Sequence, residues 1–162
     1  MKLRNLFLIP TSLLFLTSCV FDGGSKTYGF GDVVKVGDVE YTALSARNTK
    51  SIGSEYLGET TSSNFVIVNL RVRNVGNKEL SLFSSMMIYT IRNSEYEPHT
   101  AGIYLDNGFY VIMSIGSGIS KTIDVVYEIP SNYSESDYLS VKASSYSSSS
   151  KKIYMRRIQP NQ

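Results

Sequence analysis

The sequence has 162 residues, and its 16 lysines and arginines against 14 acidic residues give a formal net charge of +2. Lys2 and Arg4 belong to an N-terminal segment that we expect to be removed. The remaining chain is then neutral, with no basic field for nucleic acid. One cysteine and one histidine exclude a disulfide framework and offer too few ligands for zinc.

The first predicted element is a lipoprotein signal peptide at residues 1–18. The apolar block from Leu6 to Leu16 has signal-peptide length and is too short to span a bilayer. The run Leu16-Thr17-Ser18-Cys19 follows it and resembles the lipobox of bacterial lipoproteins. The resemblance implies cleavage before Cys19, acylation of that residue with chains such as palmitate, and extracytoplasmic anchoring. The alternative is a plain secretory signal that leaves Cys19 a free thiol.

A tether and one domain follow the predicted signal. Residues 19–30 are polar and rich in glycine, so we expect a lipidated tether. Residues 31–158 carry short apolar segments with a period near two, separated by turn residues. The predicted strands are 32–36, 39–44, 65–75, 80–82, 86–91, 109–115, 122–129, 139–143 and 153–155. A polar stretch from Arg47 to Ser63 is predicted to be a long loop, and one helical turn is expected near Ser131–Asp137.

The clearest strand is the segment from Phe65 to Val75. Val66, Val68, Leu70 and Val72 point to one side of this strand, while Asn69, Arg71 and Arg73 point to the other, so the four apolar side chains should face the core. Ile123, Val125 and Tyr127 are expected to be buried in the same way. Seven to nine such strands predict an all-β fold, an antiparallel β-sandwich.

Three stretches resemble a widespread family of bacterial lipoprotein domains of unknown function that is described as telokin-like. They are Gly31 to Thr42, Phe65 to Gly76 with its Asn-Val-Gly turn, and Gly116 to Pro130. The resemblance implies an immunoglobulin-like sandwich and export from the cytoplasm. It implies no activity and no catalytic residues.

No assembled catalytic or metal site is evident in the sequence. His99 is the only possible histidine base and follows Glu97-Pro98 in a predicted loop, where we expect it to be solvated. Asp106-Asn107-Gly108 has the composition of a tight turn, and Glu55 and Glu59 lack calcium-loop spacing. Five further carboxylates are expected on outward strand positions: Glu40, Glu95, Glu97, Asp124 and Glu128. We therefore predict no catalytic residue, no metal and no cofactor.

The leading hypothesis is a lipid-anchored envelope protein that binds a protein or another ligand without catalysis. Val20 after the cysteine favours the outer membrane where the host has one. Tyrosines and the Arg47–Ser63 stretch are the candidate binding surface. Lys151-Lys152 and Arg156-Arg157 could protect an edge strand or contact lipid headgroups or an acidic partner. The alternatives are a carbohydrate-active or other hydrolase using surface carboxylates, and a structural envelope protein.

Overall fold

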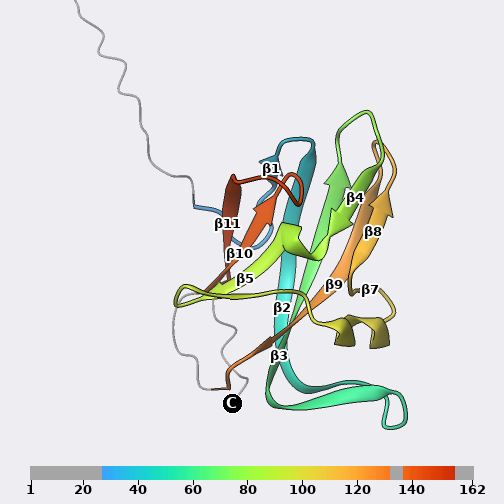
Figure 1. The fold of residues 1–162 in the computed structure, drawn as a ribbon, viewed down its shortest axis with the longest axis vertical. Coiled ribbons are helices and arrows are strands. Elements are labelled where there is room, and N and C mark those ends of the chain that lie inside the picture. Colours follow the sequence, from blue (N-terminus) through green and yellow to red (C-terminus); the bar gives the residue numbers. More distant parts are fainter. Residues whose placement is uncertain (1–26, 132–136, 156–162) are drawn as a thin grey trace, which may run out of the picture.

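The computed structural model describes residues 27–131 and 137–155, and this part of the chain is almost entirely β-structure (Figure 1). Its strands are β1 Val34–Val36, β2 Val39–Gly53, β3 Gly58–Asn74, β4 Leu80–Phe83, β5 Met87–Ile91, β6 Ser94–Tyr96, β7 Gly108–Phe109, β8 Ile112–Ile115, β9 Ser120–Ile129, β10 Asp137–Lys142 and β11 Ser150–Met155. Two 3-10 helices accompany them, η1 Ser84–Met86 and η2 Thr100–Tyr104. Among these residues, no helix is long and apolar enough to cross a membrane.

The strands form two main sheets and one ribbon. One sheet has the order β1-β2-β3-β9-β7, and the other has the order β11-β10-β5-β6. The ribbon β4-β8 closes the same core beside them, because Leu82 and Ile115 belong to the main apolar cluster. The strand pairings are antiparallel except for β7 with β9. The predicted all-β, antiparallel sandwich is confirmed.

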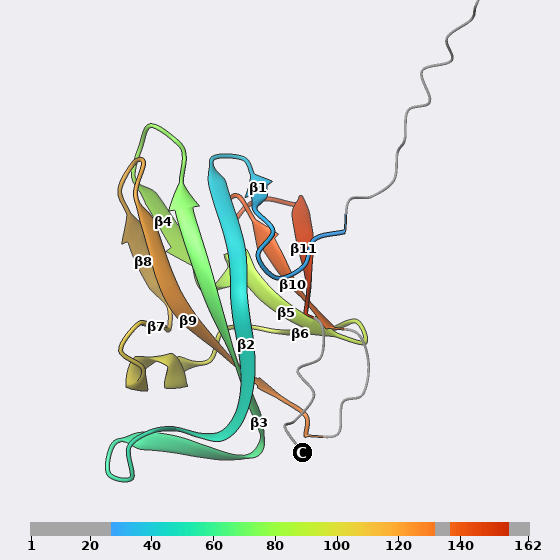
Figure 2. The same cartoon turned by 180° about the vertical axis from the view of Figure 1, so that it is seen from behind.

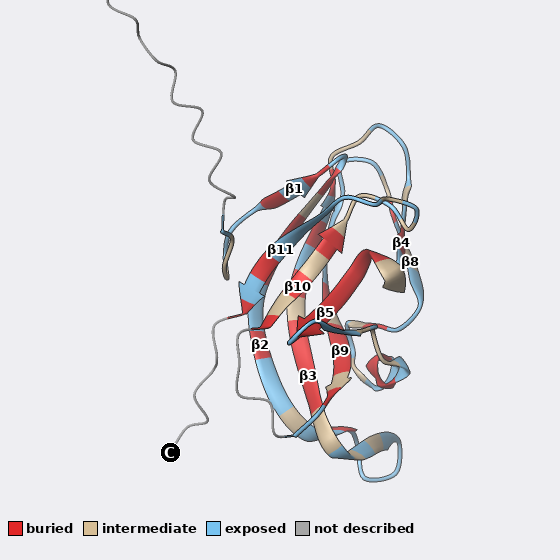
Figure 3. Ribbon diagram, turned by 60° about the vertical axis from the view of Figure 1, so that its left-hand side comes forward, coloured by how far each residue is buried: buried red, intermediate tan, exposed pale blue. Residues whose placement is uncertain are grey.

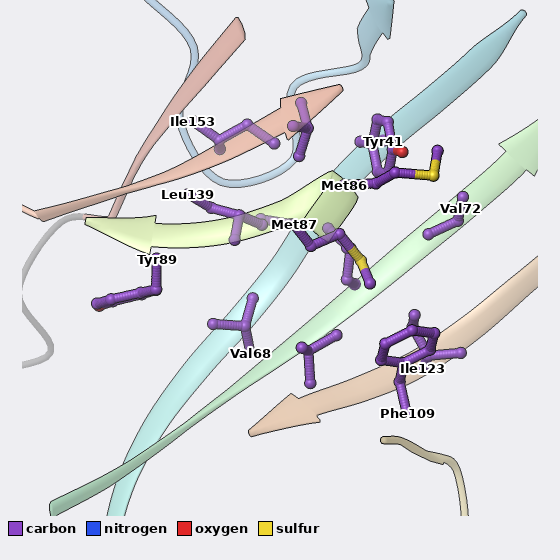
Figure 4. Close-up of a cluster of buried hydrophobic side chains, with 14 of the residues drawn as sticks. Tyr41, Val68, Val72, Met86, Met87, Tyr89, Phe109, Ile123, Leu139 and Ile153 are labelled. Carbon is purple, nitrogen blue, oxygen red and sulfur yellow. The ribbon is translucent and has the colours of Figure 1, made fainter. Parts of the chain in front are cut away.

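The core lies between the sheets, and Figure 4 shows its side chains converging from both layers. Every residue of the predicted buried set is buried: Val66, Val68, Leu70, Val72, Ile123, Val125 and Tyr127. Arg71 and Arg73 are exposed on the opposite face of β3. The predicted register of this strand is therefore confirmed, since a shift of one residue would exchange the two faces.

The other face of the five-stranded sheet is covered over part of its length by η2. A second apolar cluster forms there from Ile52, Phe65, Ile67, Ala101 and Val126. Because η2 covers this face, consecutive residues of β3 and β9, which point to opposite faces of the sheet, are all buried there. Figure 3 shows that β2 is mostly buried near its start and mostly exposed in its later part, where Ile52 is the buried residue of the contact with η2.

The prediction of a loop from Arg47 to Ser63 is wrong. β2 continues to Gly53 and β3 begins at Gly58, so the segment is a long hairpin closed by residues 54–57. Its strands carry many hydroxyl residues and face solvent on both sides over most of their length. The alternation that marks a half-buried strand is therefore absent from this part of the sequence.

Smaller boundaries also differ from the prediction. The single strand expected at 109–115 is divided into β7 and β8, which belong to different sheets. Tyr28 pairs with Ile153, and both Tyr28 and Phe30 pack against the core. The sandwich therefore includes the end of the segment predicted as tether. The predicted helical turn lies almost wholly at 132–136, outside the described residues.

Two tyrosines in the core predict a loss of stability in alkali. Tyr41 donates its phenol proton to the carbonyl of Lys142 at 2.8 Å, and Tyr127 donates to that of Met87 at 3.2 Å. Burial raises the pKa of both phenols above the ordinary value of 10.0, and an ionised Tyr41 would raise that of Tyr127 further. The unfolded chain therefore loses these protons first as the pH rises. Stability is fully present below about pH 10 and falls above it.

We expect the free energy of unfolding, measured in urea between about pH 8 and pH 11, to fall above about pH 10. Tyr127→Phe should make this fall less steep, by up to about 1.4 kcal/mol per pH unit. Tyr146→Phe is the control because that side chain is 97% exposed. Equal slopes for Tyr127→Phe and the wild type would contradict the prediction.

Candidate functional site

The paired ends of β2 and β3 form a bent arm, residues Lys50–Ser63, that turns away from the sandwich below η2 (Figures 1 and 2). The bend occurs where the register jumps from Thr49↔Phe65 to Ser51↔Thr60. Lys50 alone then faces the four residues 61–64. Its ammonium group donates to the carbonyls of Ser62, at 3.0 Å, and Ser63. These hydrogen bonds satisfy two backbone carbonyls of the bulge and fix the direction in which the arm leaves the sheet.

Two glycines close the tip of the arm. Gly53 has φ +87°, and a Cβ on it would lie 2.3 Å from the carbonyl oxygen of Leu57. A Cβ on Gly58 would lie 2.4 Å from the carbonyl oxygen of Ile52. Tyr56 and Leu57 consequently project from a tight turn, with 90% and 73% of their surface exposed. Large apolar side chains at such exposure, held on a hydrogen-bonded turn, are typical of contact surfaces.

The helix η2 extends this apolar surface. A Cβ on Gly53 would lie 3.0 Å from the Cβ of Tyr104, so η2 and the arm are in contact. Ile103 and Tyr104 are exposed on η2. We call Tyr56, Leu57, Ile103 and Tyr104 the arm patch. Four more exposed apolar residues lie on β4 and on the chain leading from β7 into β8: Phe83, Tyr110, Val111 and Ile112.

His99 joins the arm to the sandwich. Its backbone amide donates to the Val126 carbonyl at 2.7 Å, and its ring lies 5.5 Å from the Phe65 ring. Its Nε2 atom is 3.8 Å from Glu59 Oε1 on the arm and 3.7 Å from Glu128 Oε2 on β9. His99 lies in a loop, as expected, but only 28% of its side chain is exposed, so it is packed between the arm and the sandwich rather than fully solvated. The sequence gives no signal of this contact, since the three residues are far apart in the chain.

The hydrogen bonds of His99 define its chemistry. Nδ1 accepts the amide proton of Ala101 at 3.2 Å and so caps η2. In the neutral ring the proton then resides on Nε2, toward the two carboxylates. Neither nitrogen is left as an acceptor that could deprotonate a nucleophile. Thr61, the neighbouring hydroxyl, donates to Glu128 instead.

The other residues singled out in the sequence lie apart from this cluster. Asp106-Asn107-Gly108 forms the predicted turn, where the Asn107 carbonyl accepts the Asp124 amide at 2.9 Å. Asp124 accepts from Asn69 at 2.7 Å, while Glu95 and Glu97 are exposed. In the described ranges, no group of three or more His, Cys, Asp or Glu side chains is arranged so that it could hold a metal ion.

The basic residues of the last strand have identifiable surroundings. Lys151 and Lys152 lie on β11, which is an edge strand of its sheet. The Lys152 ammonium group is 4.2 Å from the Tyr138 ring centroid, and that of Lys151 is 5.7 Å from the Tyr28 ring centroid. Cys19 and Arg156-Arg157 lie outside the described residues.

The described part of the chain is a small β-sandwich whose bent arm carries exposed apolar side chains. Residues 28–153 match the family model described as a domain of unknown function, DUF4352. The chain belongs to this family. No curated protein matches it significantly.

Solved structures share the fold at low sequence identity. The yjhA protein of Bacillus subtilis has a TM-score of 0.63 at 12% identity, and the match covers 80% of this chain and 100% of that one. A "putative lipoprotein" of the same species, ycdA, has a TM-score of 0.57 at 13% identity, covering 75% and 37% of the two chains. An uncharacterised β-sandwich protein of Clostridium difficile has a TM-score of 0.50 at 12% identity, covering 81% and 94%. These likenesses show the fold alone.

Proposed function

We propose that this protein is a lipoprotein, anchored through Cys19 to the extracytoplasmic side of a membrane, whose sandwich binds a protein partner through the arm patch. The observation that carries the proposal is the exposure of Tyr56 and Leu57 at the tip of the arm. The turn that holds them is closed by hydrogen bonds between Ser54 and the backbone of Leu57, so the two exposed side chains are not needed for its stability. Tyrosine is a frequent hot-spot residue at protein interfaces. The resemblance to lipoproteins and to telokin-like, immunoglobulin-like sandwiches supports the same kind of protein.

The position of the arm suits a partner other than the anchoring membrane. The described chain begins beside β11, whereas the arm lies on the opposite side of the sandwich (Figures 1 and 2). The segment from Cys19 to Thr27 spans at most about 30 Å when extended. The anchor therefore holds the β11 side near the bilayer and leaves the arm patch accessible.

The charges around the arm indicate the character of the partner. Five carboxylates lie on the arm or on the segments that pack beside it: Glu55, Glu59, Glu97, Asp106 and Glu128. Lys50, by contrast, is bonded to backbone carbonyls. An apolar patch with acidic surroundings favours a protein surface that combines an apolar anchor with basic side chains.

The hydrolase and structural alternatives receive less support. A histidine base is disfavoured because the free lone pair of His99 accepts the Ala101 amide, and among the carboxylates Glu128 and Asp124 already accept hydrogen bonds from Thr61 and Asn69. Self-association through β11 is disfavoured by its two lysines and by Tyr28, which pairs at Ile153. Binding without catalysis is therefore the function that the geometry supports best.

We expect a photo-crosslinking residue introduced at Tyr56 to trap a discrete partner in intact cells, while the same residue at Tyr146 does not. Tyr146 is a matched control because it is a highly exposed tyrosine on the β10–β11 connection. A crosslinker at Ile103 should trap the same partner. Leu57→Asp should weaken crosslinking from Ile103 about tenfold or more, as for loss of an interface hot spot. Identical products from Tyr56 and Tyr146 would refute the arm patch as the binding surface.

A further inference from the structure

A second surface feature lies on the same sheet, at the end away from the arm. There the outer face of β2, β3 and β9 is not covered by η2 and forms a hollow of about 390 Å³. This volume lies in the range of small-molecule sites. The hollow is lined by Val33, Glu40, Thr42, Arg71, Arg73 and Ser120.

The strand register explains why these side chains meet. Arg73 stands between Glu40 on β2 and Ser120 on β9. In the next row Arg71 stands opposite Thr42. Side chains directly opposite each other on neighbouring strands share one face of the sheet. The polar lining residues therefore come from three strands whose spacing is fixed by their backbone hydrogen bonds, and Val33, just before β1, completes the lining.

The two arginines differ in their partners. Arg73 Nη1 lies 3.6 Å from Glu40 Oε2, which partly neutralises it. Arg71 is exposed, and no carboxylate of the described residues lies within ion-pair distance of it. Two guanidinium groups and one carboxylate give the lining a net charge of +1. This balance matches a monoanion, whereas Glu40 would repel a second negative charge.

We propose that this hollow binds a small monocarboxylate with an apolar substituent. The fork of Arg71 would hold the carboxylate by two parallel hydrogen bonds, a geometry for which guanidinium is suited. The Ser120 hydroxyl supplies a further donor, and Val33, about half exposed, offers an apolar wall for the substituent. A free carboxylic acid and the C-terminus of a peptide share this chemistry. The site is separate from the arm patch and does not depend on the anchor or the protein partner.

The test uses the full chain in detergent, labelled with 15N-arginine, and follows the Nε–H signals of Arg71 and Arg73 by NMR. N-acetylvaline should shift both signals saturably, and its neutral methylamide should not. Acetyl-Ala-Val with a free C-terminus extends the test to peptides. If this dipeptide binds more tightly than N-acetylvaline, the source is a peptide terminus; if less tightly, it is a small acid.

Arg71→Gln should weaken N-acetylvaline binding about tenfold, as expected for loss of a bidentate charged pair. Arg71→Lys, which keeps the charge without the fork, should recover only part of the affinity. Arg47→Gln is the control, since Arg47 is an exposed arginine of β2 outside the hollow. Equal binding of acid and methylamide, an unchanged affinity in Arg71→Gln, or tighter binding of inorganic phosphate than of N-acetylvaline would overturn the proposal.

Discussion

Replacing Leu70 by alanine is expected to lower the free energy of unfolding by about 2–5 kcal/mol, the range for a buried aliphatic residue. Leu70 is fully buried at the centre of the five-stranded sheet, between Ala43 on β2 and Ile123 on β9. Both neighbours are held in the ladder, so the sheet cannot collapse into the space that the leucine leaves. The cavity therefore adds to the loss of transfer free energy.

Leu44→Ala provides the comparison for this measurement. Leu44 is on β2 next to Ala43, and 40% of its surface is exposed. Its truncation should change the unfolding free energy by about 0.5 kcal/mol or less, as for most surface positions. Urea titrations of the two variants and the wild type would measure both values. Similar small losses for the two leucines would contradict the core assigned to β3.

The strands that were predictable from the sequence are those with one face on the core and one in solvent. In β3, buried Leu70 and Val72 alternate with the polar residues Asn69, Arg71 and Arg73, because here the two faces meet different environments; the residues from Phe65 to Val68 are buried on both faces. The same argument finds Ile123, Val125 and Tyr127 on β9. Burial of one face of a sheet produces an alternation of apolar and polar residues in the sequence, and several such alternating segments predict the fold class.

The sequence does not predict the strands of the arm because they lack this alternation of apolar and polar residues. Its two strands are solvated over most of both faces, and hydroxyl residues take the places that apolar residues would occupy in the core. Its course is set instead by single contacts, such as Lys50 with the Ser62 carbonyl. No periodicity in the sequence encodes a bulge of this size, although Gly53 and Gly58 mark its tip.

The candidate sites depend on long-range register, which composition does not reveal. The approach of His99 to Glu59 and Glu128 requires the arm to bend and η2 to pack on Phe65. The hollow requires Glu40, Arg73 and Ser120 to be adjacent in three strands. Arg71 and Arg73 were correctly placed outward from the alternation of β3. That they line one hollow with Glu40 and Ser120 follows only from the register of the neighbouring strands.

Replacing Cys19 by serine is expected to abolish lipid attachment completely. The serine hydroxyl lacks the nucleophilic thiolate sulfur on which acylation would occur. The variant should therefore take up no alkyne-palmitate. It should either leave the membrane fraction or accumulate as a precursor that keeps residues 1–18. The physical basis of the anchoring is the burial of acyl chains, at about 0.8 kcal/mol for each methylene group, with two or more chains needed for stable attachment.

Ser18→Ala is the matched control for this experiment, because it keeps a small residue before the cysteine and leaves the sulfur unchanged. It should be labelled and fractionated like the wild type. Labelling separates lipidation from retention of the apolar segment Leu6 to Leu16, since an uncleaved precursor could stay at the membrane without carrying lipid. A wild-type protein without label, or a Cys19→Ser variant that is still labelled, would exclude Cys19 as the anchor.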